Sequence, residues 1–126
     1  MKKQIIFVLF MLFAGTAVVN AQGQGQGPQR RTVEERVKSA MEKVTPALSL
    51  DQTQASRTDS VFTNYYKEMD KLRESMQGGG TPPDRSVFEK IGIDRDEKLK
   101  KIFTEAQFKK FKDEVEATLR PQRRQQ

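Results

Sequence analysis

The sequence of 126 residues contains no cysteine, no histidine and no tryptophan. Without cysteine there is no thiolate nucleophile and no disulfide, and without histidine there is no imidazole base that titrates near neutral pH. The same two absences remove the usual nitrogen and sulfur ligands of zinc and haem. Many enzyme mechanisms and the common metal centres are therefore excluded before any motif is considered.

Hydrophobic residues are scarce outside the N-terminal segment. They make up 35% of the chain, which is 44 residues, and 15 of these lie within the first 21 positions. The other 105 residues hold only 29, which is low for a globular domain, where roughly 45% of residues are apolar with glycine included. This shortage disfavours a compact two-layer core and favours an open, elongated or oligomeric helical protein.

The first 21 positions have the features of a signal peptide. A basic start at Lys2 and Lys3 precedes an apolar run over residues 5–19, and Val19 and Ala21 place small residues at the cleavage site. The run is shorter than the ~20 residues needed to cross a bilayer. We therefore predict cleavage after Ala21, export to the periplasm and no stable membrane insertion afterwards; an uncleaved N-terminal anchor is the alternative.

A polar linker separates this leader from a helical region. Residues 22–31 are rich in glutamine and glycine, cannot bury apolar surface and are predicted to be disordered. From Thr32 onward the apolar residues follow the helical period in four segments, which we place at 32–45, 51–77, 84–103 and 105–120.

The ends of these segments carry helix signals. Thr32 and Glu35 form a capping box at the start of the first segment, and Pro46 is expected to end that helix after Thr45. In the third segment, Gly92 costs ~1 kcal/mol relative to alanine, which leaves open whether the helix is broken there.

The second segment is the longest and carries a heptad seam that runs from Ala55 to Met76. One short neighbouring helix cannot cover a seam of this length, so a further partner is expected. We predict an all-α fold of two helical hairpins, about four helices, that forms a thin, elongated, dimeric cradle over residues 32–120. A polar tail follows at 121–126.

Two stretches 53 residues apart match in chemistry, LDQTQA from Leu50 and FTEAQF from Phe103. In each, a capping side chain precedes a glutamine by three positions, so that the two groups can satisfy each other's backbone amides at a helix start. An apolar residue precedes each cap. The motif residues are Leu50, Asp51, Gln54, Phe103, Thr104 and Gln107.

These two motifs, each in the order helix, turn, motif, helix on a short basic chain, resemble the LTxxQ motif of the Spy/CpxP family of periplasmic proteins. The second copy is the better match and differs mainly by Phe103 in place of leucine. The first has Asp51 where the family has threonine. The likeness covers about residues 32–119 and rests on two five-residue motifs plus the architecture.

The resemblance implies an all-α fold of helical hairpins, often paired as an antiparallel homodimer with a basic concave surface. Family members act as ATP-independent periplasmic chaperones, as envelope-stress accessory proteins that restrain a sensor kinase, or as metal-responsive relatives. The first role is our main prediction for this chain. The alternatives are a regulatory adaptor for one sensor kinase and a structural helical protein that binds no client.

The remaining residues offer little support for catalysis or metal binding. There is no G-x-S-x-G elbow, and the glycines at 78–80 lack the lysine of a phosphate loop and indicate a hinge. Met69 and Met76 lie on the heptad seam, where core packing explains them. The charge run from Asp94 to Lys101 is interpreted as a solvated helix face. We predict no enzyme activity, no metal and no cofactor.

The chain has 23 basic and 17 acidic residues, but the two kinds are interleaved and export would separate the protein from nucleic acid. The expected partners are unfolded proteins or an envelope sensor domain, together with a second copy of the chain. Cationic and off-seam apolar residues of the second segment are the candidate client-binding set. For the apolar ones, packing against the neighbouring hairpin or the dimer partner is the favoured interpretation. The set is Arg57, Val61, Tyr66, Lys67 and Lys71.

Overall fold

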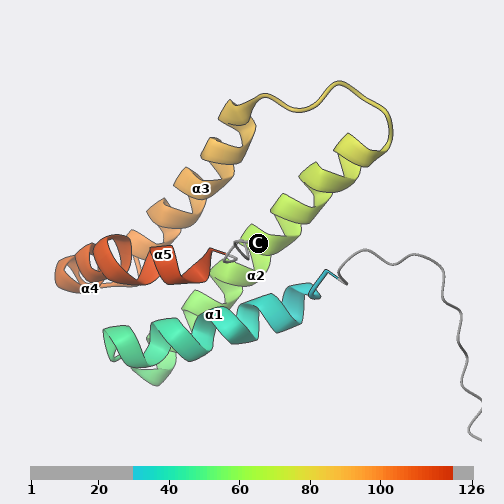
Figure 1. The fold of residues 1–126 in the computed structure, drawn as a ribbon. Coiled ribbons are helices and arrows are strands. Elements are labelled where there is room, and N and C mark those ends of the chain that lie inside the picture. Colours follow the sequence, from blue (N-terminus) through green and yellow to red (C-terminus); the bar gives the residue numbers. More distant parts are fainter. Residues whose placement is uncertain (1–29, 121–126) are drawn as a thin grey trace, which may run out of the picture.

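The computed structural model describes residues 30–120, and these residues form helices without strands (Figure 1). The elements are α1 (Val33–Leu48), α2 (Gln52–Gln77), α3 (Arg85–Lys100), α4 (Glu105–Lys110), the π-helical turn η1 (Phe111–Val115) and α5 (Glu116–Leu119). The last three follow one another without a break, so the predicted all-α fold of about four helices is confirmed. The predicted signal peptide, most of the linker and the tail lie outside the described residues.

Reciprocal side-chain caps start three of the helices. The predicted boxes of Thr32 with Glu35, Asp51 with Gln54, and Thr104 with Gln107 are all present, each with both of its hydrogen bonds. Each box satisfies two backbone amides that a helix start leaves without an internal partner. These local interactions explain why the predicted starts agree with the structure.

The predicted end of α1 is wrong by one turn. The helix continues through Pro46 to Leu48, and it ends at Ser49 in the left-handed conformation, with φ of 51°. The proline removes one helical hydrogen bond. Leu48 nevertheless becomes almost fully buried, and the amides of Ser49 and Leu50 donate to carbonyls of the last turn. Burial of an apolar side chain therefore outweighs the local signal to stop.

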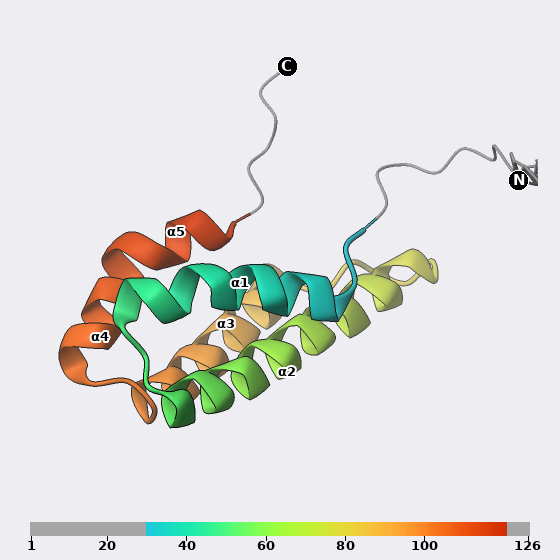
Figure 2. The ribbon, with the colours of Figure 1, turned by 90° about the horizontal axis from the view of Figure 1, so that it is seen from below.

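The helices are arranged around one end of the α2–α3 pair. Figure 1 shows α2 and α3 running alongside each other, with the loop that joins them at the far end. Figure 2 shows α1 and α5 next to each other across this pair. Contacts of α1 with α2, η1 and α5 agree with the pictures. The far end of α2 therefore has fewer neighbouring helices than its start.

The core lies where α1, α2 and the C-terminal helix meet. Its largest fully buried apolar side chains are Phe62 of α2, Leu99 of α3 and Phe111 of η1. The heptad seam is buried only over this part: Phe62 is inaccessible, whereas Met76 near the end of α2 is 39% exposed. The seam therefore contributes to the core of the chain mainly through its first half.

Helix α3 is continuous through Gly92, which answers the question that the sequence left open. Just after Gly92, the Asp94 carboxylate pairs with Lys98 one turn later, at 2.6 Å. A Cβ atom at position 92 would meet nothing within 4 Å. Glycine is therefore not required at this position by packing or by backbone conformation.

We predict that Gly92→Ala stabilises the protein. An alanine loses less backbone freedom on folding than a glycine and meets no obstacle here, so the free energy of unfolding should rise by about 0.5–1 kcal/mol. Urea denaturation followed by circular dichroism measures the change. Gly79→Ala is the control with the opposite expectation, because φ at Gly79 is +80°. A loss of stability in Gly92→Ala would contradict the prediction.

Candidate functional site

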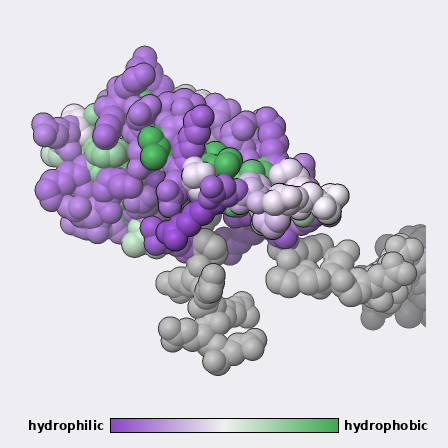
Figure 3. Space-filling model, turned by 90° about the horizontal axis from the view of Figure 1, so that it is seen from above, coloured by the Kyte–Doolittle hydropathy of each residue, from purple (hydrophilic) through white to green (hydrophobic). Residues whose placement is uncertain are grey.

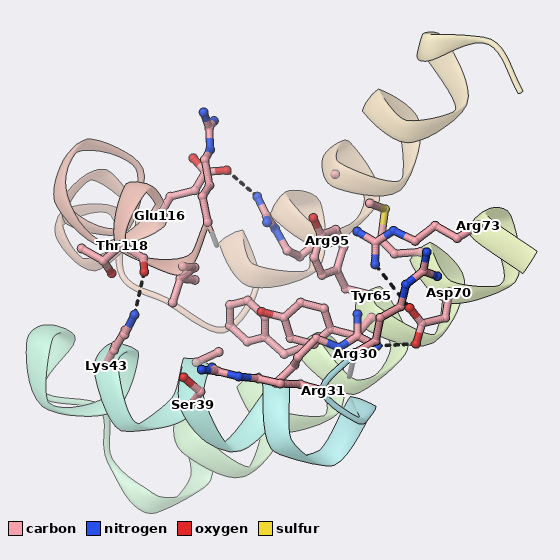
Figure 4. Close-up of a pocket in the computed structure, with 18 of the residues that line it drawn as sticks. Arg30, Arg31, Ser39, Lys43, Tyr65, Asp70, Arg73, Arg95, Glu116 and Thr118 are labelled. Carbon is pink, nitrogen blue, oxygen red and sulfur yellow. Dashed lines mark hydrogen bonds and ion pairs between the residues drawn. The ribbon is translucent and has the colours of Figure 1, made fainter. Parts of the chain in front are cut away.

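A large groove lies between α1, α2, α3 and α5 (Figure 4). Its volume is about 1070 Å³, at or above the upper end of the range of small-molecule pockets, roughly 300–1,000 Å³. We call it the basic groove. Aromatic side chains of α2 line it, namely Phe62, Tyr65 and Tyr66, together with Met69.

The walls of the basic groove concentrate positive charge. Seven of the lining residues are basic, Arg30, Arg31, Arg36, Lys43, Arg73, Arg95 and Arg120, and three are acidic, Asp70, Glu74 and Glu116. The groove thus carries a formal charge of +4.

The rest of the described surface has the opposite sign. Of the 23 basic residues, Lys2, Lys3, Arg123 and Arg124 lie outside residues 30–120, which leaves 19 against 17 acidic ones, a net charge of +2. Subtracting the seven basic and three acidic residues of the groove leaves 12 basic and 14 acidic, a net charge of −2. Folding therefore separates charges that are interleaved in the sequence, and an anionic partner is drawn towards the groove.

Two arginines are fixed over the aromatic rings. The guanidinium of Arg36 lies 5.0 Å from the ring centre of Tyr66, and that of Arg95 lies 4.8 Å from the ring centre of Tyr65. Arg36 also forms an ion pair with Asp70. Arginine over an aromatic face is stabilised by cation–π attraction, so these two side chains hold the rings in place.

Tyr66 contributes a neutral polar group to the groove. Burial raises the pKa of Tyr66 above its ordinary value, and the neighbouring Tyr65 raises it further despite the opposing influence of Arg36 and Arg95. The hydroxyl of Tyr66 therefore stays protonated at neutral pH and does not reduce the positive charge of the groove. A half-buried aromatic surface bordered by arginines can contact apolar groups and carboxylates of one ligand together.

Arg95 links the groove to the C-terminal helix. It is 8% exposed, and its Nη2 atom donates to Asp96 at 2.7 Å and to Glu116 at 2.6 Å. Burial alone would raise the pKa of Glu116, but hydrogen bonds from Lys112 and Arg95 outweigh it and lower that pKa. The predicted solvated face at residues 94–101 is therefore wrong for Arg95. The clue was its place four residues after Ile91 and four before Leu99, on the core side of α3.

The two sequence motifs meet at the other side of the core. The Nε2 atom of Gln54 donates to Oε1 of Gln107 at 2.8 Å, and that of Gln107 donates to Oε1 of Gln54 at 3.4 Å. Each amide also donates to a carbonyl that precedes the other motif: Gln54 to Ile102 at 3.1 Å and Gln107 to Leu48 at 3.0 Å. The glutamines thus join the two helix–turn–helix units, a contact that capping alone did not predict.

The apolar residues of the motifs pack locally. Phe103 is buried, and Leu50 packs partly buried against the core. The ring centres of Phe103 and Phe108 lie 6.0 and 6.4 Å from that of Phe111. Both rings thus pack on Phe111.

The predicted client-binding residues do not form one surface. Tyr66 lines the basic groove, whereas Arg57, Lys67 and Lys71 are exposed on α2 and do not line it. Val61 is 9% exposed and belongs to the core. Val61 is therefore not an exposed client contact, and the packing interpretation holds for it, because α2 buries a wider stripe than the heptad seam alone.

Sequence reasoning missed most of the groove. Tyr65 and Met69 were assigned to the seam, and the arginines at positions 30, 31, 36, 73, 95 and 120 are dispersed along the chain. No motif joins them, so only the packing of the helices brings them together. Within residues 30–120, no three acidic side chains cluster as a metal site would require, and no helix is long and apolar enough to cross a bilayer.

Comparisons with known proteins do not identify the chain. No family model, no curated protein and no solved structure matches it.

The contact between the motifs generates a prediction about stability. Gln54→Ala and Gln107→Ala should each lower the free energy of unfolding by about 1–2 kcal/mol, because each removes a cap and leaves a carbonyl without its donor. The double variant should lose less than the sum of the two, by at least about 0.5 kcal/mol. Chemical denaturation of the four proteins measures this coupling.

The box of Thr32 and Glu35 supplies the control, since its residues cap α1 alone. Glu35→Ala combined with Gln54→Ala should give additive losses. Additivity in the glutamine pair as well would show that the direct contact between the two side chains contributes nothing.

Proposed function

We propose that this protein is an exported, ATP-independent chaperone-like protein that holds unfolded polypeptide segments in the basic groove. The observation that carries the proposal is the charge separation: the groove has a net charge of +4, while the remaining described surface has −2. The aromatic lining adds apolar contact area. The predicted signal peptide and the resemblance to the Spy/CpxP family support export and this role.

The chemistry of the groove suits weak and unselective binding. Electrostatic attraction increases the rate of encounter with acidic segments and requires no defined shape. Met69 and the two tyrosines offer adaptable apolar contacts once a segment is bound. No nucleotide or metal is needed for such a cycle, because release follows when the client folds and buries its own apolar groups.

Suppression of aggregation tests the proposal. Residues 22–126 are purified and mixed with two unrelated, chemically unfolded proteins without ATP at two salt concentrations. We expect protection of both clients at near-stoichiometric ratio, weaker at high salt because exposed charges are screened within about 10 Å at 0.1 M. Protection of neither would contradict the chaperone role and favour the regulatory adaptor of one sensor kinase.

Two matched double variants locate the binding surface. Arg31→Gln with Arg73→Gln removes two charges from the groove, whereas Lys67→Gln with Lys71→Gln removes two from α2 outside it. We expect the first to need about five- to ten-fold more protein for half protection, as a loss of roughly 1–1.4 kcal/mol implies. The second should match the unmodified protein. Equal loss in both would mean that net charge alone matters.

We also propose that two copies of the chain associate. Three large hydrophobic side chains are exposed, Met76 at 39%, Val87 at 38% and Ile93 at 58%, although the face in Figure 3 is mostly hydrophilic. The end of α2 also lacks cover from α1. Sedimentation equilibrium should give twice the mass of one chain. The double variant Met76→Lys with Ile93→Lys should give the mass of a single chain. A monomeric parent chain would contradict the dimer.

A further inference from the structure

Helix α5 forms one wall of the basic groove and contributes to the core through Leu119, which is partly buried against it. It has four residues, Glu116–Leu119, and none of them is buried. Glu116 and Leu119 nevertheless line the groove, together with Arg120 directly after the helix. Since the apolar burial of these four residues is limited to the partly buried Leu119, polar contacts hold much of this wall in position.

A closed ring of four charges provides most of those contacts. Arg95 pairs with Asp96 at 2.7 Å and with Glu116 at 2.6 Å. Lys112 pairs with the same two carboxylates, at 2.8 Å to Asp96 and 2.7 Å to Glu116. Each cation therefore touches both anions. The ring joins α3, which supplies Arg95 and Asp96, to the helix that supplies the other two residues.

The ring is partly shielded from water. The side chains of Arg95 and Glu116 are 9% and 18% exposed. Arg95 is also held between two aromatic rings, with its guanidinium 4.8 Å from Tyr65 and 5.6 Å from Phe111. Screening by salt is therefore weaker here than at the exposed pairs of the surface.

The backbone next to the ring departs from the α-helix. Residues 111–115 form the π-helical turn η1 directly before Glu116. A π-helical turn inside an α-helix is uncommon and often accompanies function, since it changes the register of the side chains that follow. Here η1 begins at Phe111 and ends at Val115, and both of these residues are buried in the core. Helix α5 is therefore the part of the C-terminal helix that follows the last fully buried residue.

We propose that the ring of Arg95, Asp96, Lys112 and Glu116 is a latch that holds α5 against the basic groove and releases it when Glu116 loses its charge. Release widens the groove on the side of α5. The proposal concerns regulation of the site described under the proposed function and rests on that function for its biological meaning. The movement itself is a property of the unliganded protein.

The direction of the pH effect follows from the charges that face Glu116. Its carboxylate faces Arg95 and Asp96 of α3 and Lys112 of η1. Tyr65 of α2 lies beside Arg95. From α1, Lys43 donates to the carbonyl of Thr118. The two cations lower the pKa of Glu116 against the effect of burial. The latch is therefore fully formed above the ordinary glutamate pKa of about 4.3 and is lost as the pH falls through the lower folded value.

Hydrogen–deuterium exchange of the mature chain, residues 22–126, tests the latch without any client. In Glu116→Gln, the amides of residues 116–120 should exchange about ten-fold faster than in the parent, while core amides such as those of Val44 and Leu99 stay unchanged. Asp113→Asn is the matched control, because it removes one carboxylate of the same helix from an exposed pair with Lys109. It should exchange like the parent.

A second measurement reports the distance across the groove. The sequence has no cysteine, so Ser39→Cys and Thr118→Cys give a specific pair of spin-label sites on its two sides. Glu116→Gln should lengthen or broaden the distance distribution at neutral pH, and acid should do the same in the parent. An unchanged distance distribution would overturn the latch, because α5 would not have moved. Faster exchange over the whole chain in Glu116→Gln would also overturn it, because the ring would then stabilise the entire fold.

These outcomes are independent of the aggregation assay. If the exchange and distance changes occur but no client is protected, the latch stands and the proposed function fails. If clients are protected and neither change occurs, the proposed function stands and the latch fails.

Discussion

The paired glutamines are the contact on which the rest of the structure depends. Gln54 and Gln107 each complete a cap on their own helix and bind both the other glutamine and a carbonyl of the other unit. One amide group thus serves local and long-range structure together. Each side-chain amide uses both its oxygen and its nitrogen in these contacts, so the glutamines tie the start of each helix to the packing of the two helix–turn–helix units.

That orientation determines where the groove forms. It places α1 and the C-terminal helix side by side across α2 and α3 (Figure 2), and Phe62 of α2 contacts Phe111 of the C-terminal helix. Side chains from four helices then face a common space, and most of the charged ones are basic. A chain with few apolar residues thereby encloses a groove while keeping a small core, since ion pairs and cation–π contacts replace part of the missing apolar burial.

Arg95 shows why charge in such a protein is difficult to interpret from spacing alone. It belongs to a run of alternating charges, and its neighbour Asp94 makes the expected exposed pair with Lys98. Arg95 itself lies on the core side of α3, between Tyr65 and Phe111, and binds Glu116 from a segment 21 residues later. Two adjacent residues thus have different roles because an α-helix turns by about 100° per residue.

The sequence by itself determined the helical class and the starts of the helices, because caps and periodicity involve residues only three or four positions apart. Thr32, Asp51 and Thr104 are examples. Only the tertiary structure decided that α1 continues past Pro46, that Val61 is buried and that Gln54 meets Gln107. It likewise decided the basic groove, whose members share no motif. These features depend on contacts between residues that are distant in the sequence. Such contacts contribute to stability only when the helices have packed.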